Sequence, residues 1–506
     1  MKTRSELAFR RQFLLSPVSC DRLEDWEKTV LSPYTLYIHR DCGWVRADRE
    51  NHDEHTFDSV IVTGFIIDPH QPENTTEHLA RELVRLGTTS EVSERLYTLG
   101  GRFVLFISKG EQLFLFHDAG GLKSVFYVWH QGRFHAASQP LLLDLVVPLK
   151  KADAYGQYFG SAYAQDTKDH VPPTSMPLFE GVNQLVPNHY YDTEKKCQTR
   201  YFPVRPLQRR SFGEGAERAA GLLRQIMLAA SRHHNMVLFL SAGLDSRTVL
   251  SACRDFREQM RTCTLQFHTL NADSTDIVIA QKLAARLQVR HDVIDCTGKM
   301  DPEFEELLHM NSDIPHARFW GRNAYGLHQA LFERQLEGHI CVKGEASPVA
   351  KCVFYKNGEH PVITSHEQLV FLIKGYEEVP AAGEQIRFWH KGIQSAAEQA
   401  GYNLLDLYYW EQRLGGWTAR NQLEMDIVMD TFVPFNNREL LDLMLGVDQK
   451  HRCKPGYALF YEMIRILWED ALLEPVNPPQ KSGGSARKKV SKWLKRLVSG
   501  KISAHR

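Results

Sequence analysis

One segment, FLSAGLDSRTVLSA from Phe239 to Ala252, limits more than any other what this chain can fold into. Met236 to Leu240 is a short apolar run suited to a buried strand, and Thr248 to Cys253 continues with helical spacing. Ser241 to Ser246 is therefore predicted to be the turn between a strand and a helix. Because Gly243 has no side chain, backbone N–H groups can close around phosphate oxygens there, and the helix adds its positive dipole end.

The side chains of this turn favour a nucleotide phosphate accompanied by a metal ion. Ser241 and Ser246 can donate hydrogen bonds from their hydroxyl groups, whereas Asp245 alone would repel phosphate. The Asp245 carboxylate suits a Mg²⁺ ion that bridges phosphate oxygens. Arg247 either adds positive charge near the phosphates or faces solvent. The alternative for the whole motif is an ordinary turn with a helix cap, which short Gly and Ser motifs also form.

Strands and helices alternate after this loop. The pattern predicts strands at 262–270, 291–295 and 339–343, and helices at 276–289 and 323–336. Such alternation indicates an α/β domain with a parallel sheet, whose ligand site lies beyond the carboxyl ends of the strands. Both the loop and Gly344-Glu345 fall at such ends.

The N-terminal part has a different pattern, in which short apolar strands follow one another through turns that contain Gly and Asp. The predicted strands are 35–39, 59–67, 101–107, 113–118 and 124–130. This spacing indicates an antiparallel, β-rich domain. The polar stretch from Tyr201 to Phe212 is the predicted linker to the following domain.

Length and composition indicate a globular protein of two or more domains, because 506 residues with 43% hydrophobic content can bury large cores. The richest apolar run, Pro140 to Leu149, is too short for a membrane span and is interrupted by Asp144. The start, MKTRSELAFRRQ, lacks an apolar signal core, so we expect a cytoplasmic protein. Nine scattered cysteines without a CxxC pair predict reduced thiols and no zinc cage.

Two sets of short motifs, one in each half, follow each other in the order typical of a known family. Those of the N-terminal half are Gly100–Phe103, Asp118–Lys123, Phe126-Tyr127 and Phe134–Ser138. Those of the C-terminal half are the loop, Gly344–Ala346, Val433–Phe435 with the helix 438–445, and Pro479–Gly483. From about Gly64 to Ser482 the chain thereby resembles the asparagine synthetase-like amide ligases, and its loop resembles that of the N-type ATP pyrophosphatases.

The resemblance implies an architecture in three parts. Residues 1–205 would form an α+β domain, antiparallel and β-rich, similar to a degenerate class II glutamine amidotransferase. Residues 206–480 would form an α/β domain with a parallel sheet, similar to the adenine nucleotide alpha hydrolases, with a helical C-terminal part. Residues 481–506 would form a basic tail.

The resemblance also implies a chemistry, in which ATP activates a carboxylate as an acyl-adenylate and an amine or ammonia then displaces AMP. The implied ligands of ATP and Mg²⁺ are Ser241, Gly243, Leu244, Asp245, Ser246 and Arg247, with Asp245 as the metal ligand. One alternative is a catalytically degenerate relative that acts as a nucleotide- or partner-binding scaffold. Another, a tRNA thiolase with the same loop, lacks the paired catalytic cysteines.

Two further catalytic residues are implied by the family pattern. Glu345 matches the acid of the Gly-Glu-Gly segment, where it can accept a proton from the incoming amine or orient it. Lys454 precedes a predicted helix, 457–467, at about the place of a lysine directed to pyrophosphate, and Lys450 and Lys481 compete for this role.

The chain departs from the family at the predicted metal site. The family continues after its Gly-Glu-Gly segment with Asp-Glu, whereas this chain has Pro348-Val349, so one expected Mg²⁺ ligand is missing. Asp245 can suffice with phosphates and water, since Mg²⁺ commonly takes only one or two carboxylates. The other possibilities are a contribution from Asp313 and weakened or lost catalysis.

The second departure concerns the nitrogen donor. A glutaminase of this family uses a cysteine at its mature N-terminus, but position 2 is Lys2. Cys20 would need a propeptide to be removed, and Cys42 lies in a predicted hairpin turn. We therefore expect no glutaminase, and expect ammonia or an amine as the nucleophile.

The tail combines basic charge with an apolar helical face. Residues 480–506 carry nine Lys or Arg and no acidic residue, although the net charge of the whole chain is zero. The apolar residues of this face are Val490, Trp493, Leu494, Leu497 and Val498. The pattern predicts peripheral contact with an anionic membrane, and docking on a polyanion or a solvated tail are the alternatives.

Overall fold

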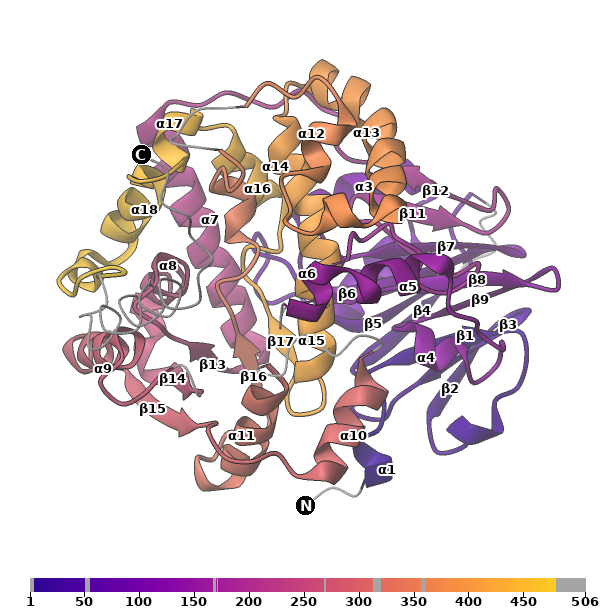
Figure 1. Ribbon diagram of the computed structural model, residues 1–506, viewed down its shortest axis with the longest axis horizontal. Helices are drawn as coiled ribbons and strands as arrows, with labels where there is room; N and C mark the ends of the chain where they lie inside the picture. The colour runs from indigo at the N-terminus through magenta and orange to yellow at the C-terminus, as the bar shows by residue number, and fades with distance from the viewer. Residues whose placement is uncertain are drawn as a thin grey trace, which may run out of the picture.

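The computed structural model describes the chain except residues 1–3, 51–54, 167–169, 171, 268–269, 313–319, 356–360 and 479–506. Two antiparallel sheets form one side of the molecule, and a parallel sheet with its helices lies on the other side (Figure 1). The predictions for the basic tail, for Asp313 and for Lys481 lie outside the described residues.

The N-terminal half contains two six-stranded antiparallel sheets. The first has the strand order β10-β8-β9-β1-β3-β2 and the second β12-β11-β7-β6-β5-β4. The strands are β1 (Phe13–Ser16), β2 (Glu27–Leu31), β3 (Tyr34–Ile38), β4 (Trp44–Asp48), β5 (Ser59–Ile67), β6 (Gly100–Lys109), β7 (Gln112–His117), β8 (Phe126–His130), β9 (Arg133–Ala137), β10 (Asn183–Gln184), β11 (His189–Asp192) and β12 (Cys197–Arg200). Every residue of β5 is buried, and β5 pairs with β6 from Ser59 opposite Ser108 to Ile67 opposite Gly100.

Short helices connect these strands. They are α1 (Arg4–Leu7), α2 (Thr76–Val84), α3 (Thr89–Thr98), α4 (Pro140–Leu143), α5 (Asp153–Gly160) and α6 (Ala162–Asp166). The Thr88 hydroxyl and the Glu91 carboxylate form a capping box that starts α3, so backbone donors of its first turn are satisfied.

The C-terminal half is built on a five-stranded parallel sheet of order β15-β14-β13-β16-β17. Its strands are β13 (Asn235–Phe239), β14 (Arg261–Gln266), β15 (Arg290–Asp295), β16 (His339–Val342) and β17 (Thr431–Phe432). The connecting helices are α7 (Phe212–His233), α8 (Leu244–Ser251), α9 (Thr275–Leu287), α10 (Pro302–Asn311) and α11 (Trp320–Glu333). The helix predicted at 276–289 is α9, and its residues Ile277, Ala280, Ala284 and Leu287 are buried.

Helices dominate the remaining C-terminal part. They are α12 (His366–Val370), α13 (Pro380–Ala400), α14 (Leu404–Tyr408), the π-helix η5 (Tyr409–Thr418), α15 (Ala419–Met425), α16 (Arg438–Leu445), α17 (Gln449–Arg452) and α18 (Ala458–Trp468). The helices α16 and α18 both pack against α7, as Figure 1 shows.

The two halves share buried contacts. The Arg102 guanidinium on β6 binds both carboxylate oxygens of Asp426, at 2.5 and 2.7 Å, and lies 3.0 Å from Asp430. The Asn436 amide donates to the carbonyl of Gly101 and to the Asp118 carboxylate, each at 2.8 Å. Motifs of the N-terminal half are therefore part of the contact with the C-terminal half.

The predicted fold class is confirmed: antiparallel sheets precede a parallel sheet and a helical C-terminal part. The differences are small. The predicted strand 262–270 ends at Gln266, and the predicted helix 323–336 ends at Glu333, before the left-handed residue Gln335 with φ 53°. The domain boundaries at 205 and 480 stay a prediction. One apolar cluster includes side chains from both halves, such as Phe103 and Phe435, so the core does not divide at these positions. Within the described residues, no helix is long and apolar enough to cross a membrane.

Candidate nucleotide site

The predicted phosphate loop joins β13 to α8 at the carboxyl edge of the parallel sheet. Gly243 is the residue before the first turn of α8. Its N–H donates to the Ser241 hydroxyl at 3.1 Å, and the Ser241 and Ser246 hydroxyl oxygens are 3.2 Å apart. The Ala242 N–H donates to the Asp276 carboxylate at 3.0 Å. The loop is thus held by its own side chains, while the first-turn amides of α8 have no partner within the helix.

Ala242 stands where the family pattern has Gly, and the structure accommodates its methyl group. The residue is buried, and its carbonyl accepts from the N–H of Asn477 at 3.0 Å. Its φ is not among the positive values found in this backbone, so the position does not require Gly.

Gly344 allows the end of β16 to contact the loop directly. A Cβ atom at this position would lie 2.8 Å from the carbonyl carbon of Asp245 and from the nitrogen of Ser246. Because β13 and β16 are parallel neighbours, their carboxyl ends meet here. Glu345 therefore follows immediately beside the phosphate loop, as the strand pattern predicts.

Glu345 is held by two groups that the sequence did not indicate. Its carboxylate accepts a hydrogen bond from the Gln422 amide on α15 at 2.7 Å and lies 3.6 Å from the ammonium group of Lys343. Lys343 in turn donates to the Asn421 amide oxygen at 2.6 Å. The Glu345 side chain keeps 21% of its surface exposed, so it remains accessible to a small molecule.

Tyr409, the first residue of η5, lies close to both acidic residues of the site. Burial is the main cause that raises the pKa of its phenol to about 12, and the carboxylates of Asp245 and Glu345 act in the same direction, against the lowering effect of Arg413. The phenol is therefore protonated at neutral pH and can donate a hydrogen bond. No motif marks Tyr409 or Gln422, because both are far from the loop in sequence.

Asp245 has two partners in the segment that follows Glu345. Its carboxylate forms an ion pair with Lys351 and accepts a hydrogen bond from the Ser347 hydroxyl. The Lys351 ammonium lies 4.7 Å from the ring centre of Phe460 and 5.2 Å from that of Tyr457, both from the start of α18. The sequence did not indicate a role for Lys351, because this residue belongs to no recognised motif.

The predicted Mg²⁺ ligand therefore has a different partner in this structure. Asp245 is paired with an ammonium group, and Pro348 offers no side-chain oxygen. Among the described residues, no group of three or more His, Cys, Asp or Glu could hold a metal ion. The residues present do not fit a Mg²⁺ ion held by the protein alone.

Arg247 requires a correction. Its guanidinium faces neither phosphate nor solvent: it is fully buried and donates to the backbone carbonyls of Ala471, Glu474 and Pro475. Burial lowers the pKa of this guanidinium. Arg247 thus joins α8 to the segment after α18.

Lys454 is exposed before α18, and no hydrogen bond or ion pair among the described residues joins it to the loop. Lys450 is also exposed and lies 3.9 Å from Asp448. Among the described lysines, Lys351 forms an ion pair with the loop.

The two candidate cysteines of the N-terminal half are buried. Burial raises the pKa of the Cys20 thiol and of the Cys42 thiol. A raised pKa disfavours the thiolate, which is the nucleophilic form.

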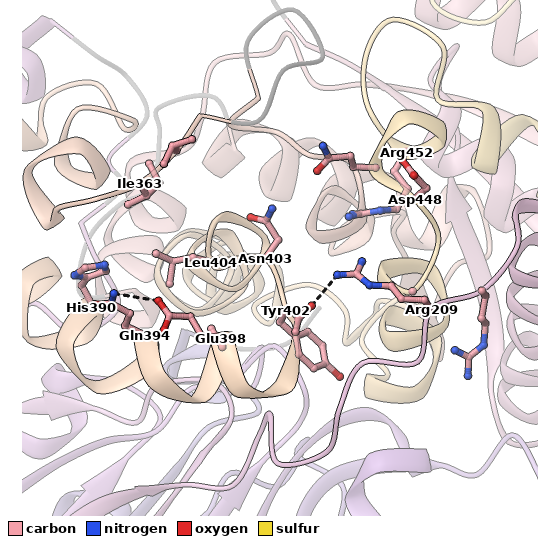
Figure 2. A pocket seen from close by; sticks show the side chains of 16 residues that line it. Arg209, Ile363, His390, Gln394, Glu398, Tyr402, Asn403, Leu404, Asp448 and Arg452 are labelled. Atoms are coloured by element: carbon pink, nitrogen blue, oxygen red, sulfur yellow. Dashed lines mark hydrogen bonds between the residues drawn. The ribbon is translucent and has the colours of Figure 1, made fainter.

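A cavity of about 750 Å³ lies along α13 (Figure 2). His390, Gln394 and Glu398 line one side, and Arg209 and Arg452 line the other. None of its lining residues belongs to the phosphate loop or to the segment 344–351. Its size alone does not connect it to the nucleotide chemistry.

Comparison with known proteins agrees with the geometry of the loop and the parallel sheet. The family model described as asparagine synthase matches residues 223–341, which include the loop, β13 and most of β16. Residues 223–341 form an asparagine synthase domain. Glu345 and Lys351 follow the matched segment of this domain. A search of curated protein sequences finds no match to the chain.

Comparison with solved structures finds similarity at low identity and low TM-score. The glutamine-dependent NAD+ synthetase from Acinetobacter baumannii, in complex with ADP, has 15% identity over 32% of this chain and 30% of that chain, with a TM-score of 0.20. The NMN synthetase from Francisella tularensis has 16% identity over 37% of this chain and 95% of that one, with a TM-score of 0.20. The glutamine phosphoribosylpyrophosphate amidotransferase from B. subtilis, in complex with ADP and GMP, has 10% identity over 76% and 88%, with a TM-score of 0.25. This chain thus spans less than a third of the NAD+ synthetase.

Proposed function

We propose that this protein is an ATP-dependent, AMP-forming amide ligase that activates a carboxylate for attack by ammonia or an amine. The observation that carries the proposal is the contact of Gly344 with the backbone of Asp245 and Ser246, which places Glu345 beside a phosphate loop. That loop belongs to an asparagine synthase domain. A phosphate-binding turn and a candidate proton acceptor thus meet at one edge of the sheet.

The proposed reaction has two steps. A carboxylate oxygen attacks the α-phosphorus of ATP, the bond to the bridging oxygen of the β-phosphate breaks, and pyrophosphate leaves with the electron pair. The amine nitrogen then attacks the acyl carbon, loses a proton to Glu345, and displaces AMP. The loop and the first-turn amides of α8 stabilise the charge on the departing pyrophosphate, and such preorganised electrostatics usually contributes most to lowering the barrier of an enzymatic reaction.

Tyr409 and Gln422 support the second step in this proposal. The Gln422 amide orients the Glu345 carboxylate at 2.7 Å, and the protonated phenol of Tyr409 can donate to an oxygen of the adenylate. Mg²⁺ would enter bound to the phosphates of ATP, because Asp245 is paired with Lys351.

The nitrogen source that we propose is ammonia or an amine on a larger substrate. The raised thiol pKa of Cys20 and Cys42 supports the absence of a glutaminase, since neither thiol is activated. Supplying glutamine or ammonium in the same assay tests this. Glutamine-dependent activity that Cys20→Ala abolishes would contradict it.

The test of the ligase is carboxylate-dependent exchange of labelled pyrophosphate into ATP, measured over a panel of amino acids, peptides and glycan-linked carboxylates. We expect Asp245→Ala and Glu345→Gln to separate the steps. Asp245→Ala should lose the exchange, whereas Glu345→Gln should retain exchange but lose amide formation. Equal pyrophosphate release by Asp245→Ala and the parent protein would show that the proposal is wrong.

A second candidate function is a nucleotide- or partner-binding scaffold without turnover. The ion pair of Lys351 with Asp245 favours it, because this pair occupies the carboxylate that the family pattern assigns to a metal ion. A scaffold would bind ATP in calorimetry and show no exchange with any carboxylate. The basic tail 481–506 remains a proposed contact with an anionic membrane or polyanion, which sedimentation with anionic vesicles tests.

A further inference from the structure

A buried lysine lies on the side of the phosphate loop where a metal ion was predicted. Lys351 is 8% exposed, and its ammonium group pairs with the Asp245 carboxylate. The same carboxylate accepts the Ser347 hydroxyl. Asp245 is thus turned toward the segment 347–351, and the positive charge at this point of the loop comes from the protein.

The backbone around Lys351 is built to hold this position. Ser347–Ala350 form the short helix η3, and the Lys351 N–H donates to the Pro348 carbonyl at 3.0 Å. Ala346 and Cys352, on either side, have the left-handed φ values 64° and 52°. Such conformations cost free energy in residues other than Gly and cluster at functional sites. The strain therefore marks a segment whose shape is maintained by its surroundings.

The aromatic residues at the start of α18 complete the surroundings of the ammonium group. The ring centres of Phe460 and Tyr457 lie 4.7 and 5.2 Å from Lys351 Nζ, distances at which an aromatic face attracts a cation. Tyr457 itself has a left-handed φ of 45°. Two rings and one carboxylate thus stabilise the charged form of Lys351 without neutralising all of its donors.

The chemistry of an ammonium group suits a phosphate ligand here. It has three N–H donors, and the Asp245 carboxylate can take one or two of them. A remaining donor is available to an oxygen of pyrophosphate bound at the first turn of α8. A lysine acts as a point charge for phosphate in other nucleotide sites. Because it is covalently tethered, this cation cannot dissociate with the product.

We propose that Lys351 takes the place of a protein-held metal ion and binds the pyrophosphate that leaves ATP. This inference rests on the proposed function. When the α–β phosphoanhydride bond breaks, the electron pair stays on the bridging oxygen of pyrophosphate. Lys351 donates a hydrogen bond to that product, keeps its proton and remains paired with Asp245. The phosphate loop then holds no divalent metal ion through Asp245 in the absence of nucleotide.

The first experiment measures the binding of pyrophosphate to the full-length protein by calorimetry in the presence of EDTA. We expect the parent protein to bind, and Lys351→Met to bind at least about tenfold more weakly, because a charged hydrogen bond is lost. The matched control is Lys282→Met, which removes an exposed lysine of α9 and should leave the affinity unchanged. The double variant Lys351→Met, Asp245→Asn removes the ion pair as a unit and should show the same loss if Lys351→Met alone does not fold.

The second experiment measures Mn²⁺ binding without nucleotide by electron paramagnetic resonance. We expect the Mn²⁺ binding of the parent protein and of Asp245→Asn to be the same, because Asp245 does not hold a metal ion. Detection of a Mn²⁺ site that Asp245→Asn removes, or equal pyrophosphate affinity of the parent and Lys351→Met, would overturn the inference. A parent protein that binds pyrophosphate only with added Mg²⁺ would also overturn it, while leaving the ligase intact. A different result would contradict the proposed ligase function alone. In that case the protein shows no exchange of pyrophosphate into ATP, but it still binds pyrophosphate through Lys351.

Discussion

At the residue scale, the site depends on close backbone contacts as much as on charged groups. Gly344 is the clearest case, because an added methyl group would lie 2.8 Å from two backbone atoms of the loop. We expect Gly344→Ala to move the loop, to weaken ATP binding at least about tenfold and to cost about 1–3 kcal/mol of stability. Calorimetry and chemical denaturation measure the two effects. Gly213→Ala, at an exposed position of α7 with nothing within 4 Å, should leave ATP binding unchanged and should not lower stability, because Ala favours a helix more than Gly does.

Arg247 stabilises the fold through its contacts with the segment after α18. Its guanidinium donates to three backbone carbonyls, so Arg247→Met should lower the free energy of unfolding by about 2–4 kcal/mol. Urea denaturation measures this change, and Arg254→Met, which removes an exposed arginine of η2 (Arg254–Gln259), is the control. If Arg247→Met were as stable as the parent but bound ATP weakly, the phosphate role predicted from sequence would be restored.

At the scale of elements, β6 and the turn after β7 join the two halves. Arg102 is 2% exposed and pairs with Asp426 and Asp430. Burial alone would raise the pKa of Asp430, but Arg102, Lys123 and Arg11 more than offset this and lower it. The half-buried Asp430 carboxylate is therefore ionised, and removal of the arginine would take this partner from Asp430 and from the buried Asp426.

We expect Arg102→Met to reduce the free energy of unfolding by about 3–5 kcal/mol, the usual cost of breaking a buried ion pair from one side. Guanidinium denaturation followed by tryptophan fluorescence measures it. Arg81→Met breaks the exposed pair with Glu77 on α2 and should cost less than about 1 kcal/mol. A similar loss in both variants would show that the contact between the halves contributes little.

At the scale of the whole molecule, several histidines are kept neutral by the fold. Burial lowers the pKa of His39, His117, His135, His189 and His291 from 6.5 to about 4. In the unfolded chain these groups take up protons below pH 6.5, whereas in the folded protein they do so only near pH 4. The unfolded state therefore binds more protons in this window, and stability falls as the pH falls.

We expect the free energy of unfolding to decrease from about pH 6.5 to about pH 4, with an upper limit of about 1.4 kcal/mol per pH unit for each histidine that stays neutral. Urea denaturation at a series of pH values measures the slope. His291→Gln, at the half-buried histidine of β15, should flatten it. A stability that is constant over this window would contradict the neutral, buried state of these groups.

The sequence alone was sufficient for the fold class and for the position of the loop. Apolar spacing and turn residues act within short windows, so β13, the turn and α8 could be located from Met236 to Cys253. The parallel direction of the strands also followed, because strands alternate with helices, and it placed the loop and Glu345 at the same edge of the sheet.

Only the tertiary structure decided the partners of the charged groups. Asp245 meets Lys351, Arg247 turns inward, and Tyr409 and Gln422 reach the site from segments distant in sequence. These partnerships depend on which segments the parallel sheet brings to one edge and on which side chains lose contact with water there. Local sequence determines where a strand or helix forms, whereas the pairing of buried charges is set by packing between distant segments, because an unpaired buried charge is costly.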